Sequence, residues 1–119
     1  MKTVLAADLG GTKCRVALLA EDLSMLNREP VATSMDRESF LATLESEFAA
    51  LLEMPRPEGW ESPAAIGIGT AGVITKDLSS VVYAPNLPLE GLDLRAEFKT
   101  RLDLPTSLIN DGRASALGE

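Results

Sequence analysis

The segment Asp-Leu-Gly-Gly-Thr-Lys near the start of the chain combines residue types that suit phosphate and metal binding. Two adjacent glycines, Gly10 and Gly11, are expected to supply the positive φ of a tight turn and to leave backbone N–H groups pointing at phosphate oxygens. The Thr12 hydroxyl and the Lys13 ammonium group add to this. The Asp8 carboxylate is suited to hold Mg²⁺ through water. The alternative is a plain hairpin turn.

A second candidate for chemistry lies near the other end of the chain, at Asn110 and Asp111. The sequence contains no histidine, so acid–base chemistry falls to carboxylates or lysines. Asp111 is the leading candidate for a general base that removes the proton of a substrate hydroxyl, while Asn110 fixes a neighbouring hydroxyl. The alternative role of Asp111 is to cap a following helix, worth ~1 kcal/mol.

Two further segments have the character of ligand loops. Small residues surround Thr70 and Gly72, directly after an apolar run, and they permit a ligand to approach the backbone closely. An Asn-Leu-Pro segment begins at Asn86. Taken alone, either segment is equally consistent with an ordinary turn or loop.

The elements that must position these residues follow from the hydrophobic pattern. Apolar and β-branched runs indicate strands, whereas apolar residues at helical spacing after Asp36 and after Asp93 indicate two helices. The predicted elements, in order, are strands at 3–7, 13–20 and 26–33, a helix at 36–52, a strand at 64–69, an extended segment at 81–83, a helix at 94–102, a strand at 106–109 and a helix at 114–118. This order predicts an α/β fold, a mixed sheet with crossover helices.

Composition excludes several classes of protein. A chain of 119 residues supports one hydrophobic core, and 18 acidic against 11 basic residues give a net charge of −7, which disfavours nucleic acid as a partner. One cysteine, Cys14, and no histidine leave no disulfide and no Cys/His zinc site. No apolar run reaches the ~20 residues of a membrane span, so no membrane partner is expected. We expect a cytoplasmic protein in a reducing compartment.

Taken together and in this order, the four segments resemble the motifs of the ROK family of sugar kinases, the glucokinase-like branch of the actin, Hsp70 and hexokinase superfamily. The resemblance spans nearly the whole chain. It implies an RNase H-like (actin-like ATPase) domain with a mixed five-stranded sheet, and ATP-dependent phosphorylation of a sugar hydroxyl. Which sugar is phosphorylated stays open, because the residues around Leu89 and Arg113 depart from the common family pattern.

The resemblance also implies a role for each candidate residue. Gly10, Gly11, Thr12 and Lys13 would face the phosphates of ATP, and Asp8 would face Mg²⁺. The residues implied to line the sugar pocket are Thr70, Gly72, Asn86, Asn110 and Asp111, the last of which would also be the catalytic base.

Members of this family are considerably longer and have a second lobe, which completes the adenosine and sugar sites. Residues 1–119 are therefore expected to form the amino-terminal lobe of a two-lobed kinase, with little or no activity alone. No helix-turn-helix precedes the first strand, so the repressor role found in some family members is disfavoured.

Two other classes remain as alternatives. An RNase H-like nuclease, such as a Holliday-junction resolvase, also fits three opening strands with an early Asp8, although the net charge of −7 argues against DNA binding. The third class is a non-catalytic module that binds a sugar or a partner protein. An exposed cleft face would favour self-association, so a homo-oligomer is also expected.

Overall fold

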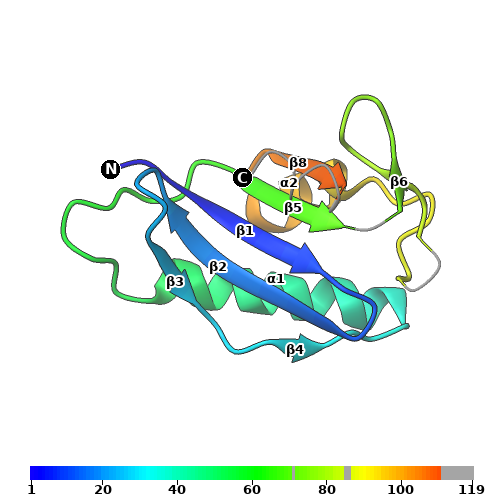
Figure 1. The fold of residues 1–119 in the computed structure, drawn as a ribbon, viewed down its shortest axis with the longest axis horizontal. Helices are drawn as coiled ribbons and strands as arrows, with labels where there is room; N and C mark the ends of the chain where they lie inside the picture. Colours follow the sequence, from blue (N-terminus) through cyan, green and yellow to red (C-terminus); the bar gives the residue numbers. More distant parts are fainter. Residues whose placement is uncertain (71, 85–86, 111–119) are drawn as a thin grey trace.

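The computed structural model describes residues 1–70, 72–84 and 87–110 (Figure 1). Its helices are α1 (Arg37–Glu53) and α2 (Leu94–Leu102). The strands are β1 (Thr3–Leu9), β2 (Lys13–Ala20), β3 (Met25–Asn27), β4 (Val31–Ala32), β5 (Ile66–Thr70), β6 (Val73–Ile74), β7 (Val81–Tyr83) and β8 (Thr106–Asn110).

The main sheet is mixed, as expected. Its strand order is β3-β2-β1-β5-β8, and β4 pairs with β2 beside β3. β1 and β2 form an antiparallel hairpin, whereas β5 lies parallel to β1 on one side and to β8 on the other. The mixed sheet is confirmed, but it has six strands instead of the predicted five, because the segment 26–33 forms β3 and β4. The parallel pairs follow from the two crossovers that contain α1 and α2.

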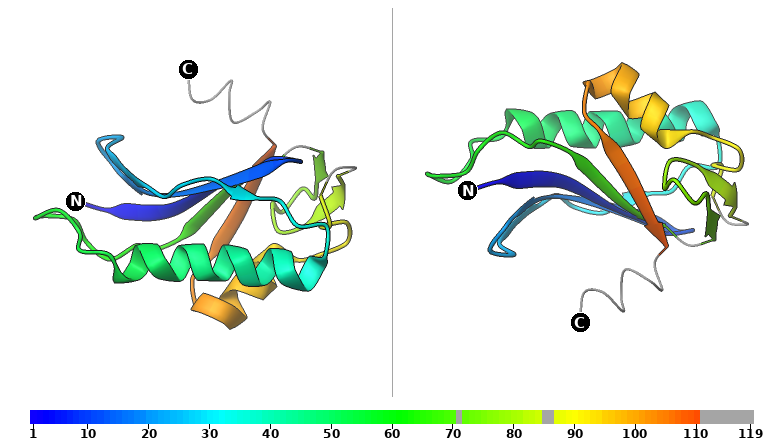
Figure 2. Two further views of the ribbon diagram at one scale, coloured as in Figure 1. Left: turned by 90° about the horizontal axis from the view of Figure 1, so that it is seen from below. Right: turned by 90° about the horizontal axis from the view of Figure 1, so that it is seen from above.

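Both described helices cover the same face of the sheet (Figure 2). α1 begins where Asp36 caps it, because the Asp36 carboxylate accepts a hydrogen bond of 2.9 Å from the backbone N–H of Ser39. α2 begins in the same way, with a bond of 2.9 Å from the Ala96 N–H to the Asp93 carboxylate. The cap at Asp93 was predicted and is confirmed, whereas for α1 the sequence predicted the start of the helix but not its cap.

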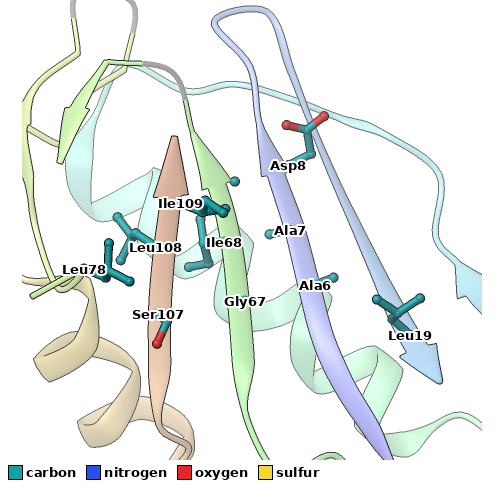
Figure 3. A pocket seen from close by; sticks show the side chains of 11 residues that line it. Ala6, Ala7, Asp8, Leu19, Gly67, Ile68, Leu78, Ser107, Leu108 and Ile109 are labelled. Carbon is teal, nitrogen blue, oxygen red and sulfur yellow. The ribbon is translucent and has the colours of Figure 1, made fainter. Parts of the chain in front are cut away.

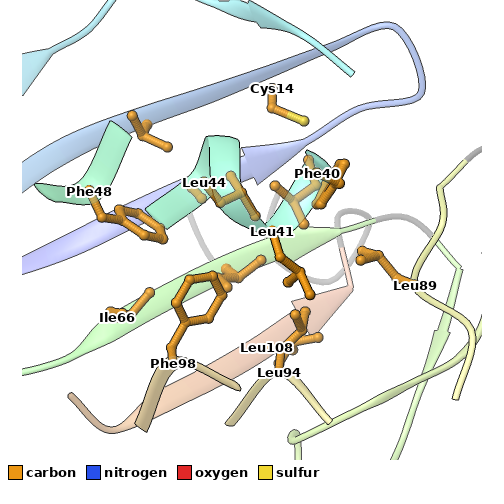
Figure 4. Packing of buried hydrophobic residues seen from close by; sticks show 14 of the residues in the cluster. Cys14, Phe40, Leu41, Leu44, Phe48, Ile66, Leu89, Leu94, Phe98 and Leu108 are labelled. Atoms are coloured by element: carbon orange, nitrogen blue, oxygen red, sulfur yellow. The ribbon is translucent and has the colours of Figure 1, made fainter. Parts of the chain in front are cut away.

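The core lies between the helices and the sheet (Figure 4). The buried residues of α1 recur at helical spacing and are Phe40, Leu41, Leu44, Phe48 and Leu51. They meet alternate residues of the strands, such as Ile66 and Leu108, and the rings of Phe48 and Phe98 join α1 to α2 edge to face at 5.5 Å. This packing holds α1 and α2 against one face of the sheet.

Two predicted segments differ from the structure. The single strand expected over 26–33 is two short strands, β3 and β4, separated by a break that contains Pro30. Proline has no N–H to donate, so it interrupts the ladder. The predicted loop after Thr70 contains β6, which pairs with β7 in a separate two-stranded sheet. The helix expected at 114–118 lies outside the described residues.

Within the described part of the chain, neither helix has the length and apolar character needed to cross a membrane.

Candidate active site

Three strands that are far apart in the sequence end at one edge of the sheet. In the parallel register, Leu9 of β1 lies beside Thr70 of β5, and Thr70 lies beside Asn110 of β8. The hairpin that follows β1 and the loop that follows β5 therefore leave from the same edge (Figure 1). Ligands of open α/β sheets bind at such edges, outside the carboxyl ends of parallel strands.

The hairpin between β1 and β2 is closed by a hydrogen bond of 3.0 Å from the Gly10 N–H to the Lys13 carbonyl. We expected Gly10 and Gly11 to supply a positive φ. That expectation is wrong, because the described glycines with positive φ are at other positions, such as Gly72. Gly10 is required for space instead: a Cβ at this position would lie 2.8 Å from the Lys13 carbonyl oxygen.

Thr33, just beyond β4, contacts the back of this hairpin. Its hydroxyl donates to the Gly10 carbonyl at 2.6 Å, and its backbone N–H donates to the Thr12 carbonyl at 2.9 Å. This residue was not predicted from the sequence. No local pattern could have identified it, since 23 positions separate it from Gly10.

Asp8 lies near the end of β1 on the sheet face opposite the helices (Figure 3). It is exposed, and it borders a hollow of about 810 Å³ on that face. Other residues that line the hollow are small or apolar and include Ala6, Gly67, Gly69, Ser107 and Ile109. The described residues contain no group of three or more metal-ligating side chains. A single exposed carboxylate still fits Mg²⁺, which binds proteins through one or two carboxylates and keeps several waters.

The loop after β5 is shaped by its own chain. Thr70 is fully buried at the end of β5. Gly72 has φ +101°, and a Cβ there would overlap the Tyr83 carbonyl oxygen and come within 3.1 Å of the Ala84 Cα. The absence of a side chain at Gly72 therefore admits the neighbouring backbone of β7. The contact of Thr70 and Gly72 with a sugar stays a prediction.

The turn between β6 and β7 is shaped by Asp77 and is joined to β8 of the sheet at Leu78. Its carboxylate accepts hydrogen bonds from the Thr75 hydroxyl at 2.6 Å and from the Ser79 hydroxyl at 2.8 Å, and these bonds hold the pKa of Asp77 below its usual range. The Arg95 guanidinium donates to the Asp77 carbonyl, and the Leu108 N–H donates to the Leu78 carbonyl at 2.9 Å. The turn therefore covers part of the free edge of β8.

Asn86 and Asp111 lie outside the described residues, and of Asn110 only the strand position is described. The segment after Asn86 is held to the start of α1. Arg37 donates to the Pro88 carbonyl at 2.9 Å and to the Glu90 carbonyl at 2.7 Å. This clamp was not predicted from the sequence.

Comparison with known proteins identifies the family. Residues 4–119 match the ROK family. A glucokinase from Streptomyces coelicolor is 31% identical over 119 residues, which are all of this chain and 36% of the relative. A putative xylose repressor from Caldicellulosiruptor sp. is 36% identical over 78 residues, which are 64% of this chain and 20% of the relative.

The structure agrees with these matches. It superimposes with a TM-score of 0.84 and 29% identity on the crystal structure of a ROK family glucokinase from Streptomyces griseus in complex with glucose and AMPPNP, covering 98% of this chain and 36% of that one. The chain thus spans about a third of the length of such relatives. Its α/β fold is that of the ROK sugar kinases within the actin-like ATPase fold, and the chain belongs to the ROK family.

Proposed function

We propose that the protein containing this chain is an ATP-dependent sugar kinase and that residues 1–119 form its amino-terminal lobe. The observation that carries this proposal is the common edge at which β1, β5 and β8 end. It brings the glycine hairpin to the same edge as the loop after β5, which we assign to the sugar. The glucokinase relative in complex with glucose and AMPPNP supports a sugar and a nucleotide as the two ligands.

In this proposal the hairpin binds the phosphates of ATP. Gly11 and Thr12 are exposed, and Lys13 adds a positive charge at the first position of β2. Asp8, one residue before the end of β1, would hold Mg²⁺ through water. Bound Mg²⁺ would neutralise the charge that develops on the phosphate groups during transfer.

On the sugar side, we assign Asp111 as the general base and Asn110 as a ligand of a neighbouring hydroxyl. Removal of the hydroxyl proton by a positioned carboxylate accelerates such a transfer by roughly 10²- to 10⁴-fold. Thr70, Gly72 and Asn86 complete the proposed sugar pocket. From the cysteine usage alone, we place the reaction in the cytoplasm.

The test of the base is Asp111→Asn in the full-length protein. The amide cannot accept the proton, so turnover should fall at least about 100-fold. Sugar affinity, measured by calorimetry, should stay close to that of the wild type. Asp103→Asn is the matched control, because Asp103 is an exposed residue at the end of α2. Turnover that survives in Asp111→Asn would refute the assignment.

Repression is the second candidate function, because a putative xylose repressor is among the relatives. A turnover assay with the full-length protein separates a kinase from a repressor. A kinase shows sugar-dependent consumption of ATP, whereas a repressor binds its sugar without turnover. A gel shift with branched DNA tests the nuclease alternative, which the net charge of −7 disfavours.

A further inference from the structure

Thr33 contacts two carbonyl groups of the glycine hairpin at once. The Thr33 hydroxyl donates to the Gly10 carbonyl at 2.6 Å, and the Thr33 N–H donates to the Thr12 carbonyl at 2.9 Å. The Cys14 thiol lies 3.3 Å from the Thr33 hydroxyl oxygen and is itself buried. With its hydroxyl proton directed to Gly10, Thr33 accepts from this thiol. The side chain is thus held between β2 and the hairpin.

These two bonds fix the direction of two amide N–H groups. The described chain contains no cis peptide bond, and in a planar trans peptide the C=O and N–H groups point in opposite directions. The Gly10 carbonyl shares its peptide with the Gly11 N–H, and the Thr12 carbonyl shares its peptide with the Lys13 N–H. Because both carbonyls point toward Thr33, both N–H groups point away from it.

One of these two amide groups suits an anion. The Lys13 N–H lies on the same side of β2 as the Lys13 carbonyl and so faces the β1 arm of the hairpin. A backbone N–H of a turn that points away from the rest of the hairpin is suited to bind a phosphate oxygen. The Gly10 N–H is excluded from this role, since it donates to the Lys13 carbonyl at 3.0 Å. Among the described residues, the Gly11 N–H has no acceptor.

We propose that Thr33 is a positioning residue for the phosphates of ATP. It touches no substrate. It holds the Gly10 and Thr12 carbonyls away from the phosphates and keeps the Gly11 N–H directed at them. This inference rests on the proposed function, and it extends the phosphate site to a residue outside the glycine motif.

The test compares Thr33→Val with Thr33→Ser in the full-length protein. Valine has nearly the same shape but lacks the hydroxyl, whereas serine retains it. For Thr33→Val, we expect the KM for ATP to rise roughly three- to tenfold, in line with the loss of one hydrogen bond. The KM for the sugar should stay within about twofold of the wild type, and Thr33→Ser should restore the KM for ATP. Affinity for AMPPNP, measured by calorimetry, gives a second readout.

Thr3→Val is the matched control. Like the Thr33 hydroxyl, the Thr3 hydroxyl donates to a backbone carbonyl, that of Glu61, at 2.9 Å. Thr3 lies at the end of β1 that is far from the hairpin. We expect Thr3→Val to lower the thermal unfolding midpoint and to leave the KM for ATP unchanged. An unchanged KM for ATP in Thr33→Val would overturn the inference. An equal rise in Thr3→Val or in Thr33→Ser would also overturn it.

The readouts separate this inference from the proposed function. If the wild type binds AMPPNP but phosphorylates no sugar, the kinase proposal fails, and the AMPPNP affinity of Thr33→Val still decides the role of Thr33. A wild type that binds no nucleotide would overturn both.

Discussion

At the scale of single residues, the glycines of this chain serve different purposes. Gly10 leaves space for the Lys13 carbonyl, whereas Gly72 combines φ +101° with close contact to the backbone at Tyr83 and Ala84. Gly91 also has a positive φ, of +74°, but no atom lies within 4 Å of the position of a Cβ. A side chain at Gly91 would therefore cause backbone strain alone, whereas a side chain at Gly72 would cause both backbone strain and steric overlap.

Replacing Gly72 by alanine should destabilise the protein more than replacing Gly91. Gly91→Ala adds only backbone strain, about 1 kcal/mol. Gly72→Ala adds a displacement of the neighbouring backbone, for a total of about 3 kcal/mol. Urea titration of both variants of the full-length protein measures the two free energies of unfolding. Equal losses would show that the contact between Gly72 and Tyr83 does not constrain the loop.

At the scale of elements, α1 does more than cover the sheet. Its first residue, Arg37, holds the carbonyls of Pro88 and Glu90, and its cap, Asp36, fixes where the helix begins. The hydrogen bond from the Ser39 backbone N–H holds the pKa of Asp36 below its usual range. The start of α1 is therefore sensitive to acid.

The sign of this effect follows from the direction of the shift. Because the pKa of Asp36 is lower in the folded state, its stabilisation is present above the unfolded value of about 3.9 and is lost as the pH falls below it. The gap in thermal midpoint between the wild type and Asp36→Ala should thus shrink from about pH 6 to about pH 3. Asp36→Asn, a cap that does not titrate, should keep its advantage over Asp36→Ala at both values. A constant gap for the wild type would contradict the assignment.

At the scale of the whole molecule, the sheet has two unlike faces. α1 and α2 cover one face (Figure 2), and the hollow beside Asp8 lies on the other (Figure 3). Phosphoryl transfer to a sugar needs a site from which water is excluded, since water competes as an acceptor. The chain spans about a third of its kinase relatives, so we infer that another part of the protein closes the site.

The isolated 119-residue chain should therefore show little or no turnover, whereas the full-length protein should be active. Coupled assays with glucose, fructose and N-acetylmannosamine measure this and also identify the sugar. Circular dichroism and a cooperative thermal transition must first show that the chain folds. A folded chain that phosphorylates any of these sugars at the full-length rate would contradict the two-lobed proposal.

Local signals in the sequence determined most of the elements. Apolar residues at helical spacing predicted both described helices, and Asp93 was also predicted as a cap, because periodicity and capping involve residues a few positions apart. The order of four motifs determined the family, which the comparison confirms. The predicted single strand over 26–33 was wrong, because Pro30 has no N–H for the ladder and lies in the break between β3 and β4.

The tertiary structure alone decided how the site is built. The register that aligns Leu9, Thr70 and Asn110 joins segments from three parts of the chain, and the bonds from Thr33 to the hairpin connect positions on different strands. A hydrogen bond between distant residues leaves no periodic trace in the sequence, because any residue with a suitable donor satisfies it. The sequence thus indicated the candidate phosphate-binding residues, and only the folded chain shows which distant groups form hydrogen bonds with them.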